Sequence, residues 1–295
     1  MRGLGAAVLL LLVLLLLVLL LLSAACSPTS VLNAVAPRDG VTLTRDVPYQ
    51  DGLRHMLDVY APRPTATPAP VVVFFYGGSW ESGSKDIYRF VGAALAARGV
   101  MTMIPDYRLY PQMHFPAFMK DAAAAAAWAR GNAQRFGGDP RRLFLMGHSA
   151  GGQIATLLAL DASYLRAEGL SAQRDICGVI GLAGPYDFLP LHSATLEAIF
   201  GPEDERPRSQ PINFVSAQAP PMLLLAGRDD DTVDPGNTLR LAARLRSAGG
   251  TVEDKLYPGV GHITLIAAFS GPLTFLAPVR AAALSFVAAH GECGG

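Results

Sequence analysis

Residues 146–152 read Met-Gly-His-Ser-Ala-Gly-Gly, and this stretch decides the fold of the 295-residue chain. Its central residue, Ser149, follows a short apolar run at residues 143–145 and precedes residues 152–160, which have the length and composition of a helix. A GxSxG pentapeptide at a sharp turn from strand to helix exposes its serine as a nucleophile. The same pentapeptide, taken alone, also fits a glycine-rich turn whose serine caps the helix. The order of the surrounding motifs has to decide between the two.

Strand-like and helix-like segments alternate along the chain. The predicted strands cover residues 71–75, 100–104, 143–145, 176–182, 222–226 and 251–257. The predicted helices cover residues 87–98, 118–136, 152–160, 237–248 and 276–289. Residues 42–47 and 56–60 should form an opening antiparallel pair, because Gln50-Asp51-Gly52 supplies a turn between them. Apolar strands that alternate with helices predict an α/β fold, in which helices cover both faces of a mostly parallel sheet.

One large domain is predicted over residues 41–292. The proline-rich residues 62–70 read as a surface connection and not as a boundary, because the strand pattern resumes directly after them. Residues 185–215 are long and irregular, and we expect a small partial cap there. Residues 26–40 are predicted to be an exposed tether in front of the domain.

The N-terminus predicts export. Residues 6–22 are an unbroken run of Ala, Val and Leu behind the single cation Arg2, and Ser23-Ala24-Ala25-Cys26 follows. This pattern is typical of a signal peptide at residues 1–25. Its small-residue exit resembles the lipobox of bacterial lipoproteins, in which Cys26 would carry the lipid, and this is the outcome we favour. Ser23 departs from the usual aliphatic residue, so cleavage by the general signal peptidase and an uncleaved membrane anchor stay open.

Composition narrows the class of partner. The chain carries 24 basic and 24 acidic residues, and this balance argues against nucleic acid. Besides Cys26 there are only Cys177 and Cys293, too few for a disulfide scaffold. Export would permit these two cysteines to form a disulfide, but the sequence does not show that they do. The apolar neighbours of Cys177 predict that it is buried as a small hydrophobic residue. Cysteine spacing matches no metal site, and no metal or organic cofactor is predicted.

The partners that a serine nucleophile needs follow Ser149 in the required order. A hydroxyl is a weak nucleophile until a histidine accepts its proton, and that imidazole needs a carboxylate. The loop after strand 222–226 carries four acids, of which one is needed: Asp229, Asp230, Asp231 and Asp234. Among the six histidines, only His262 follows a later strand. This order predicts that the serine is a nucleophile.

A negatively charged oxygen also forms in acyl transfer, and backbone N–H groups must stabilise it. One donor should be the amide of Ala150, directly after the nucleophile. The others should come from the loop Tyr76-Gly77-Gly78-Ser79-Trp80 after strand 71–75, where paired glycines let the main chain approach a substrate. Gly78 and Ser79 are the expected donors of this loop.

With these motifs in place, the chain resembles the α/β-hydrolase family, specifically the hormone-sensitive-lipase-like and related carboxylesterases. The resemblance runs from Leu57 to His262. It also includes the motifs Leu57-Asp58-Val59-Tyr60, Asp106-Tyr107-Arg108-Leu109-Tyr110-Pro111, Phe115-Pro116-Ala117, Phe136-Gly137-Gly138-Asp139-Pro140 and Gly184-Pro185-Tyr186-Asp187-Phe188. Tyr76 stands where the family usually has histidine, and Ser79 where lipase-like members often have a third glycine, which puts the support of this loop in question.

The resemblance implies an α/β-hydrolase fold and a catalytic triad. The family's spacing places the acid three residues after Gly227 and three before Val233, which selects Asp230, with Asp229 as the next candidate. The implied triad is therefore Ser149, Asp230 and His262. Three aromatic residues could line the substrate pocket or belong to the core: Trp80, Tyr186 and Phe188.

The implied activity is hydrolysis of a small or aryl carboxylic ester through an acyl-enzyme. The segments Gly-Gly-x-Trp and Gly-x-Tyr-Asp look most like carboxylesterases that border on arylformamidases and feruloyl-type esterases. An amidase, arylformamidase or peptidase on the same triad is the alternative, and a non-catalytic binding protein on this scaffold is the more distant one. The sequence leaves acyl specificity and oligomeric state open.

Overall fold

A computed structural model describes residues 28–291 and 293. The predicted signal peptide and the lipidation candidate Cys26 lie outside the described residues. Within the described part of the chain, every helix is too short or too polar to cross a membrane.

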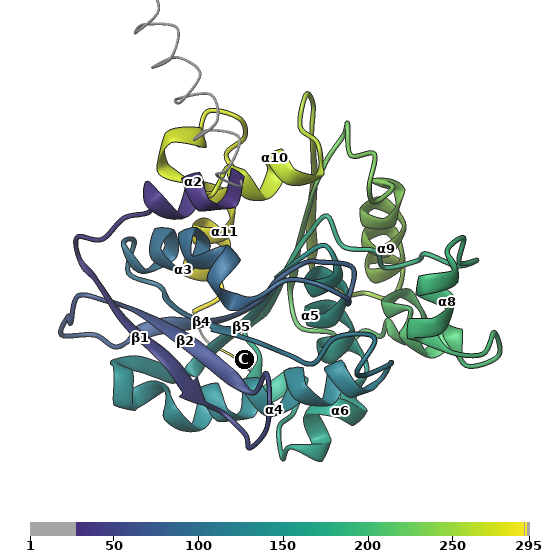
Figure 1. The fold of residues 1–295 in the computed structure, drawn as a ribbon, viewed down its shortest axis with the longest axis horizontal. Coiled ribbons are helices and arrows are strands. Elements are labelled where there is room, and N and C mark those ends of the chain that lie inside the picture. Colours follow the sequence, from purple (N-terminus) through teal and green to yellow (C-terminus); the bar gives the residue numbers. More distant parts are fainter. Residues whose placement is uncertain (1–27, 292, 294–295) are drawn as a thin grey trace, which may run out of the picture.

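The core is one eight-stranded sheet with the strand order β1-β2-β4-β3-β5-β6-β7-β8 (Figure 1). Its strands are β1 (Val41–Pro48), β2 (Met56–Pro62), β3 (Ala69–Phe75), β4 (Met101–Pro105), β5 (Gly138–His148), β6 (Gly178–Leu182), β7 (Met222–Gly227) and β8 (Val252–Tyr257). β2 pairs antiparallel with both β1 and β4, and the pairs from β4 through β8 are parallel. Apolar side chains of β3 to β7 are buried on both faces, as expected for a parallel sheet covered by helices. The predicted α/β fold is therefore confirmed.

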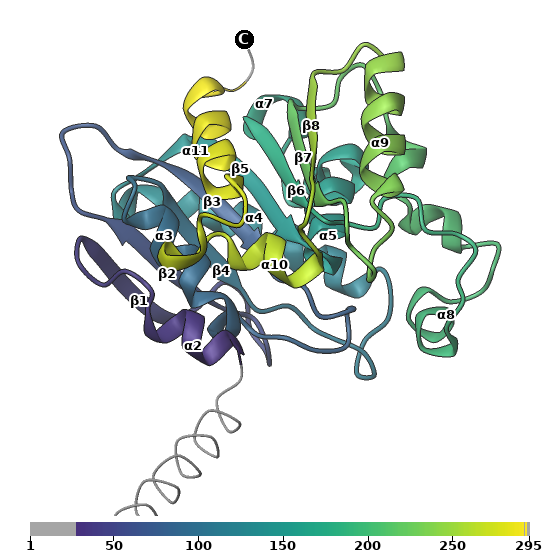
Figure 2. The ribbon, with the colours of Figure 1, turned by 90° about the horizontal axis from the view of Figure 1, so that it is seen from above.

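Helices cover both faces of this sheet (Figures 1 and 2). The α-helices are α2 (Pro28–Ala34), α3 (Arg89–Ala96), α4 (Ala117–Asn132), α5 (Ala150–Leu160), α6 (Ala162–Ala167), α7 (Ala172–Asp175), α8 (Ala194–Phe200), α9 (Gly236–Ser247), α10 (His262–Ala267) and α11 (Val279–Ala289). Short 3₁₀ turns are η1 (Lys85–Tyr88), η2 (Ala133–Phe136), η3 (Arg206–Ser209), η4 (Pro211–Phe214) and η5 (Gly271–Leu273). α3 and α11 lie on one face, and α4 and α5 lie on the other. The sequence did not predict the short helices α6, α7 and α10.

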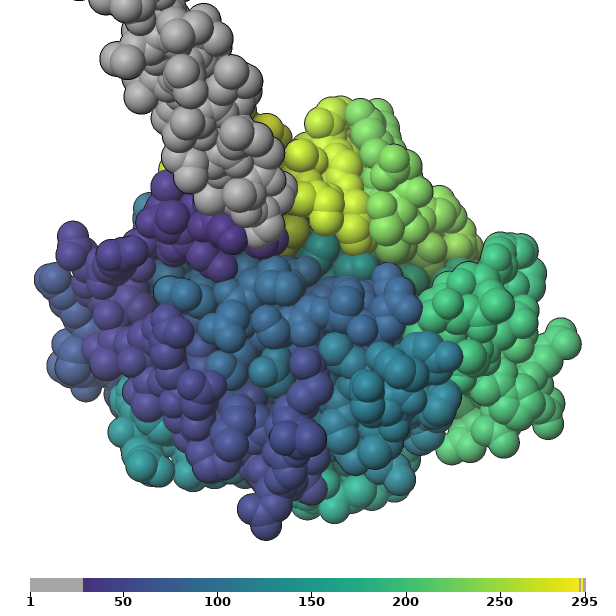
Figure 3. All heavy atoms as spheres, in the orientation of Figure 1, coloured from purple at the N-terminus to yellow at the C-terminus, as the bar shows by residue number. Residues whose placement is uncertain are grey.

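The segment predicted as a partial cap, residues 185–215, contains α8, η3 and η4. It forms a lobe at the right edge of the molecule in Figures 1 and 3, where α8 lies below α9. Phe200 of α8 and Ile199 are buried, so the lobe packs onto the domain through apolar side chains.

The segment predicted as an exposed tether, residues 26–40, contains a short helix that the sequence did not predict. Residues 28–34 form α2, whose Leu32 is buried against the domain. The Asn33 side chain donates to the carbonyl oxygen of Asp86 at 2.8 Å and accepts from the amide of Phe90 at 2.9 Å. These contacts with η1 and α3 make α2 a part of the folded domain.

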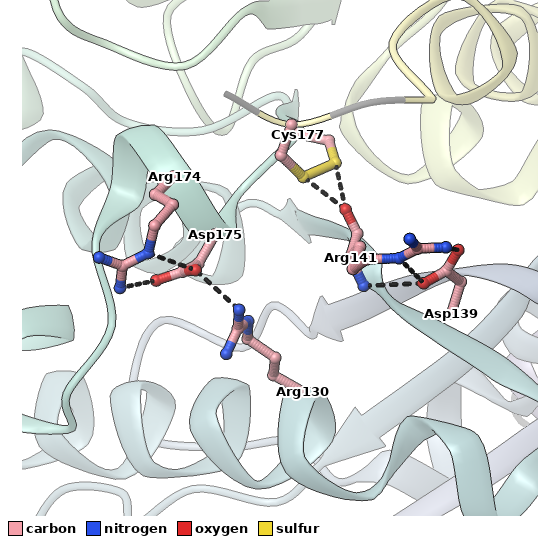
Figure 4. Close-up of a disulfide and its surroundings, with 7 residues drawn as sticks. Arg130, Asp139, Arg141, Arg174, Asp175 and Cys177 are labelled. Carbon is pink, nitrogen blue, oxygen red and sulfur yellow. Dashed lines mark hydrogen bonds and ion pairs between the residues drawn. A yellow bond between two sulfur atoms is a disulfide. The ribbon is translucent and has the colours of Figure 1, made fainter. Parts of the chain in front are cut away.

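Cys177 and Cys293 form a disulfide that joins the start of β6 to the end of the chain (Figure 4). The sequence left this pairing open, and Cys177 is both buried and bonded. The carbonyl oxygen of Arg141 lies 3.3 Å from the sulfur of Cys177, and Asp139 accepts hydrogen bonds from the Arg141 side chain and amide. The disulfide closes a loop over a sequence separation of 116 residues.

Replacement of both disulfide cysteines by serine should lower the free energy of unfolding by about 2–4 kcal/mol, because a long cross-linked loop restricts the unfolded chain. Hydrolytic activity should stay close to that of the wild type, because neither cysteine lines the cavity in front of Ser149. Urea unfolding of both proteins measures the difference. An unchanged midpoint under oxidising conditions would show that the bond does not contribute in solution.

Candidate active site

Ser149 stands at a strained turn between β5 and α5. Its backbone angles are φ 56° and ψ −124°, a region that residues other than glycine rarely adopt. The glycines on either side allow the close packing of this turn. A Cβ atom on Gly147 would lie 2.0 Å from the carbonyl oxygen of Gly151, and one on Gly151 would lie 2.0 Å from that of Phe75. The structure thus places half-buried Ser149 at the turn from strand to helix predicted from the sequence, where it lines a cavity.

Asp230 and His262 form a hydrogen-bonded pair. His262 Nδ1 lies 2.8 Å from Asp230 Oδ2, and the other carboxylate oxygen accepts the amides of Thr232 and Val233 at 3.0 and 2.9 Å. The neighbouring acids Asp229 and Asp231 are exposed, whereas Asp230 is buried. The structure therefore brings the first-choice acid of the sequence analysis, and not its alternative, to the histidine.

The Asp230 carboxylate determines which nitrogen of His262 carries the proton. Burial by itself would raise the pKa of Asp230, but hydrogen bonds from His262 and from two backbone amides outweigh it and lower the pKa. The carboxylate is therefore ionised at neutral pH and accepts the Nδ1 proton of His262. This leaves Nε2 of the imidazole as the proton acceptor.

His148, the residue before Ser149 in the elbow, packs against His262. Its ring lies 4.7 Å from the ring of His262, and its Nε2 lies 3.3 Å from the carbonyl oxygen of His262. Nδ1 of His148 lies 3.3 Å from the hydroxyl of Tyr88. Burial and the nearby His262 lower the pKa of His148 to about 3, so its ring stays neutral. The sequence does not single out His148, because no local pattern indicates that it contacts a residue more than a hundred positions away.

The neutral state of His148 predicts a pH dependence of stability. In the unfolded chain its pKa returns to about 6.5, so between pH 6.5 and about 3 the unfolded state binds a proton that the folded state does not. Acid therefore favours unfolding in this window, by up to about 1.4 kcal/mol per pH unit, and the contribution is complete only above pH 6.5. Urea unfolding between pH 4 and 7 should show this slope. In His148→Gln the slope should be smaller, and an identical slope in both proteins would refute the assignment.

The loop after β3 lies directly against the nucleophile. A Cβ atom on Gly77 would lie 2.9 Å from Cβ of Ser149, so the two main chains are in close contact. Gly78, Ser79 and Trp80 have consecutive positive φ angles of 136°, 54° and 60°. Ser79 and Ala150 line the same cavity as Ser149. The expected oxyanion donors are the amides of Gly78 and Ser79 in this loop and of Ala150 at the start of α5.

Tyr76, the departure from the family's histidine, supports this loop through a buried network. Its hydroxyl donates to Asp106 Oδ1 at 2.9 Å and accepts from Arg54 Nη2 at 2.6 Å. Arg54 also donates to the carbonyl oxygen of Gly83, at the far end of the loop. The ring of Tyr107 stacks on that of Tyr76 at 4.6 Å. Tyr76 therefore supports the start of this loop, although the family usually has histidine at its position.

The cavity in front of Ser149 has a volume of about 440 Å³. Trp80 and Phe188 both line it, and their rings stack at 5.8 Å. Tyr186 does not line it: its side chain is fully buried against Gly181 and Gly184, so the substrate-binding role suggested for Tyr186 is corrected to a core position.

A polar wall of the same cavity was not predicted. Arg240 of α9 donates to Asp187 Oδ2 at 2.6 Å and to Asp234 Oδ2 at 3.2 Å, and all three residues line the cavity. The cavity thus has an aromatic side and a charged side. Among the described residues, no group of three or more His, Cys, Asp or Glu side chains is placed to hold a metal ion.

Comparison with known proteins identifies the family. The model of the BD-FAE family, an α/β-hydrolase family, matches residues 57–245. The chain belongs to the BD-FAE family. It is 32% identical to Esterase LipC of Mycobacterium tuberculosis over 74% of this chain, and 29% identical to isoprenylcysteine alpha-carbonyl methylesterase ICME of Arabidopsis thaliana over 75%. The chain spans little more than half of these curated relatives, 59% and 56% of their lengths.

Solved structures of other proteins share the fold of this BD-FAE member. Esterase B from Lactobacillus rhamnosis superposes with a TM-score of 0.78 at 19% identity, over 94% of this chain and 95% of that one. A truncated carbohydrate esterase from gut microbiota gives a TM-score of 0.73 at 21% identity, over 87% and 99%. These likenesses confirm the predicted α/β-hydrolase fold.

Proposed function

We propose that the chain hydrolyses small or aryl carboxylic esters through an acyl-enzyme. The observation that carries the proposal is the hydrogen-bonded pair of His262 and ionised Asp230, whose imidazole lies 4.7 Å from the ring of His148, the residue directly before Ser149 on the strained elbow. A binding protein would gain nothing from backbone strain at a hydroxyl or from a buried carboxylate on a histidine. The family and its esterase relatives support the same reaction.

In the first half of the reaction, Ser149 Oγ attacks the ester carbonyl carbon while Nε2 of His262 takes its proton. The carbonyl oxygen becomes negative, and the amides of Gly78, Ser79 and Ala150 are the donors proposed to stabilise it. His262 then gives the proton to the leaving alcohol as the carbon–oxygen bond breaks. Asp230 stabilises the imidazolium throughout and keeps its orientation.

In the second half, a water molecule attacks the acyl group on Ser149, and His262 takes a proton from that water. The ester bond to Ser149 breaks, its oxygen recovers the proton from His262, and the carboxylic acid leaves. The cavity of about 440 Å³, with Trp80 and Phe188 on one wall, matches a small acyl or aryl group.

Matched substrates test this assignment. p-Nitrophenyl acetate and p-nitroacetanilide carry the same acyl group on oxygen and on nitrogen. We expect kcat/KM to be at least about a hundredfold higher for the ester, because its carbonyl is more electrophilic than that of an amide and p-nitrophenolate leaves without the protonation that an amine leaving group needs from His262. A higher kcat/KM for the anilide would favour the amidase alternative.

We further propose that the mature chain is exported and tethered to a membrane through Cys26. The disulfide between Cys177 and Cys293 supports export, since such bonds persist mainly in oxidising compartments. Metabolic labelling with a fatty acid should mark the wild type and not Cys26→Ser. Label on both proteins, or on neither, would contradict lipidation at Cys26.

A further inference from the structure

A second cavity, of about 210 Å³, lies between α2, β1 and α3. The residues that line it are Asn33, Ala36, Pro37, Arg38, Val41, Leu43, Tyr60, Arg89 and Ala93. None of these residues lines the cavity in front of Ser149. The proposed reaction leaves this second cavity without a function.

The cavity contains a buried donor without a partner. Tyr60 of β2 is only 2% exposed, and no described group forms a hydrogen bond with its hydroxyl. Burial raises the pKa of Tyr60, so the hydroxyl keeps its proton and can donate. A buried polar group without a partner is costly, so an acceptor brought into the cavity by a ligand would stabilise the structure.

Two arginines complete the polar lining. Arg38 is exposed and Arg89 is half-buried, and no carboxylate of a described residue lies within ion-pairing distance of either. The residues that line the cavity include no acid, and the carboxylates of Asp46 in β1 and Asp58 in β2 pair with Lys85 at 2.7 and 3.0 Å. The two guanidinium groups and the Tyr60 hydroxyl therefore favour an oxyanion, and guanidinium matches phosphate in geometry.

The position of α2 indicates where such an anion would come from. α2 begins at Pro28, two residues after Cys26, and two extended residues span at most about 7 Å. Val31 of α2 and Val35, directly after the helix, are 52% and 47% exposed, and their spacing of four residues places both on one side of this turn. A lipid on Cys26 would hold this apolar side at the membrane surface, beside the cavity.

We propose that the cavity between α2, β1 and α3 binds the phosphate of an anionic phospholipid headgroup. Tyr60, Arg38 and Arg89 supply the donors, and Val41 and Leu43 supply an apolar wall. The proposal rests on the membrane tether proposed above. Free phosphate has the same chemistry, and the experiment below separates the two sources.

Occupation of this site would orient the catalytic domain. α2 is fixed to η1 through Asn33, and Tyr88 of η1 contacts His148 beside the nucleophile. In Figure 2, α2 and the α8 lobe lie toward the same edge of the molecule. A bound headgroup, together with the lipid on Cys26, gives two attachment points, and two points restrict the orientation of the domain more than one does.

The test uses the full chain in micelles of a nonionic detergent. Thermal unfolding is followed without addition, with an ether-linked phosphatidylglycerol that no esterase can cleave, with the matching diether glycerol without phosphate, and with inorganic phosphate. Variants are Arg38→Gln/Arg89→Gln and Tyr60→Phe. Arg63→Gln is the matched control, because exposed Arg63 lies beside Gly40 but does not line the cavity.

The phosphatidylglycerol should raise the unfolding midpoint of the wild type and of Arg63→Gln by at least about 3 °C, since a ligand stabilises the state that binds it. The rise should be lost in the double arginine variant and reduced in Tyr60→Phe. Diether glycerol should have no such effect. If the double arginine variant does not fold, the smaller rise of the midpoint in Tyr60→Phe tests the proposal.

Three results would overturn the proposal: no rise in the wild type, an equal rise in all variants, or an equal rise with inorganic phosphate at the same concentration. The last of these would assign the cavity to a soluble anion. Activity on p-nitrophenyl acetate should be the same in the wild type and in the three variants. A chain that responds to lipid but hydrolyses no ester would refute the proposed hydrolase and leave this site standing.

Discussion

Replacement of Ser149 by alanine is expected to lower kcat on a p-nitrophenyl ester by about three to six orders of magnitude, as for serine nucleophiles in general. The hydroxyl is the only group of the elbow that can form the acyl-enzyme, and alanine removes it without changing the volume of the turn much. The residual rate should be that of hydroxide attack helped by the oxyanion donors.

A matched control separates loss of chemistry from loss of fold. Ser193 lines the same cavity, and its side chain makes no capping hydrogen bond to α8. Ser193→Ala should retain kcat within a few fold. Both variants should unfold at the midpoint of the wild type within a few degrees, and near-full activity of Ser149→Ala would sink the assignment of the nucleophile.

Replacement of Asp230 by asparagine is expected to have the second largest effect, a loss of about three to four orders of magnitude in kcat. An amide at this position can donate a hydrogen bond to Nδ1 of His262, so Nε2 would carry the proton and could no longer accept one from Ser149. The imidazolium would also lose its counter-charge.

The neighbouring acids provide the control for Asp230. Asp229→Asn and Asp231→Asn remove the same charge from exposed side chains of the same loop, and both should keep kcat within a few fold. Activity lost in Asp229→Asn and kept in Asp230→Asn would move the acid to the alternative that the sequence left open.

Much of the site could be predicted from the sequence because its chemistry is carried by short motifs. The elbow at Ser149 and the loop at Gly77 and Gly78 each have a local signature, and the strands before them are apolar enough to be recognised. Chain order then leaves one histidine, His262. The choice of Asp230 depended on the spacing known from the family, because three adjacent aspartates cannot be distinguished from the sequence alone.

The remaining features depend on contacts between distant parts of the chain. His148 contacts the carbonyl of His262, Asn33 holds α2 on η1, and Cys177 meets Cys293 only after the sheet has formed. Tyr186 illustrates the limit most plainly. Its sequence context resembles that of a pocket residue, but small glycines opposite its ring, which only the fold brings together, make room for it in the core.

The central claim is that Ser149 becomes a nucleophile through His262 and Asp230. Reaction of the full chain with a fluorophosphonate probe, followed by mass spectrometry of the peptides, tests it most directly. The account predicts one covalent adduct on Ser149, no adduct in Ser149→Ala, and labelling of Asp230→Asn slower by orders of magnitude. Absence of an adduct on Ser149 in the folded wild type, or an adduct on another serine, would contradict it.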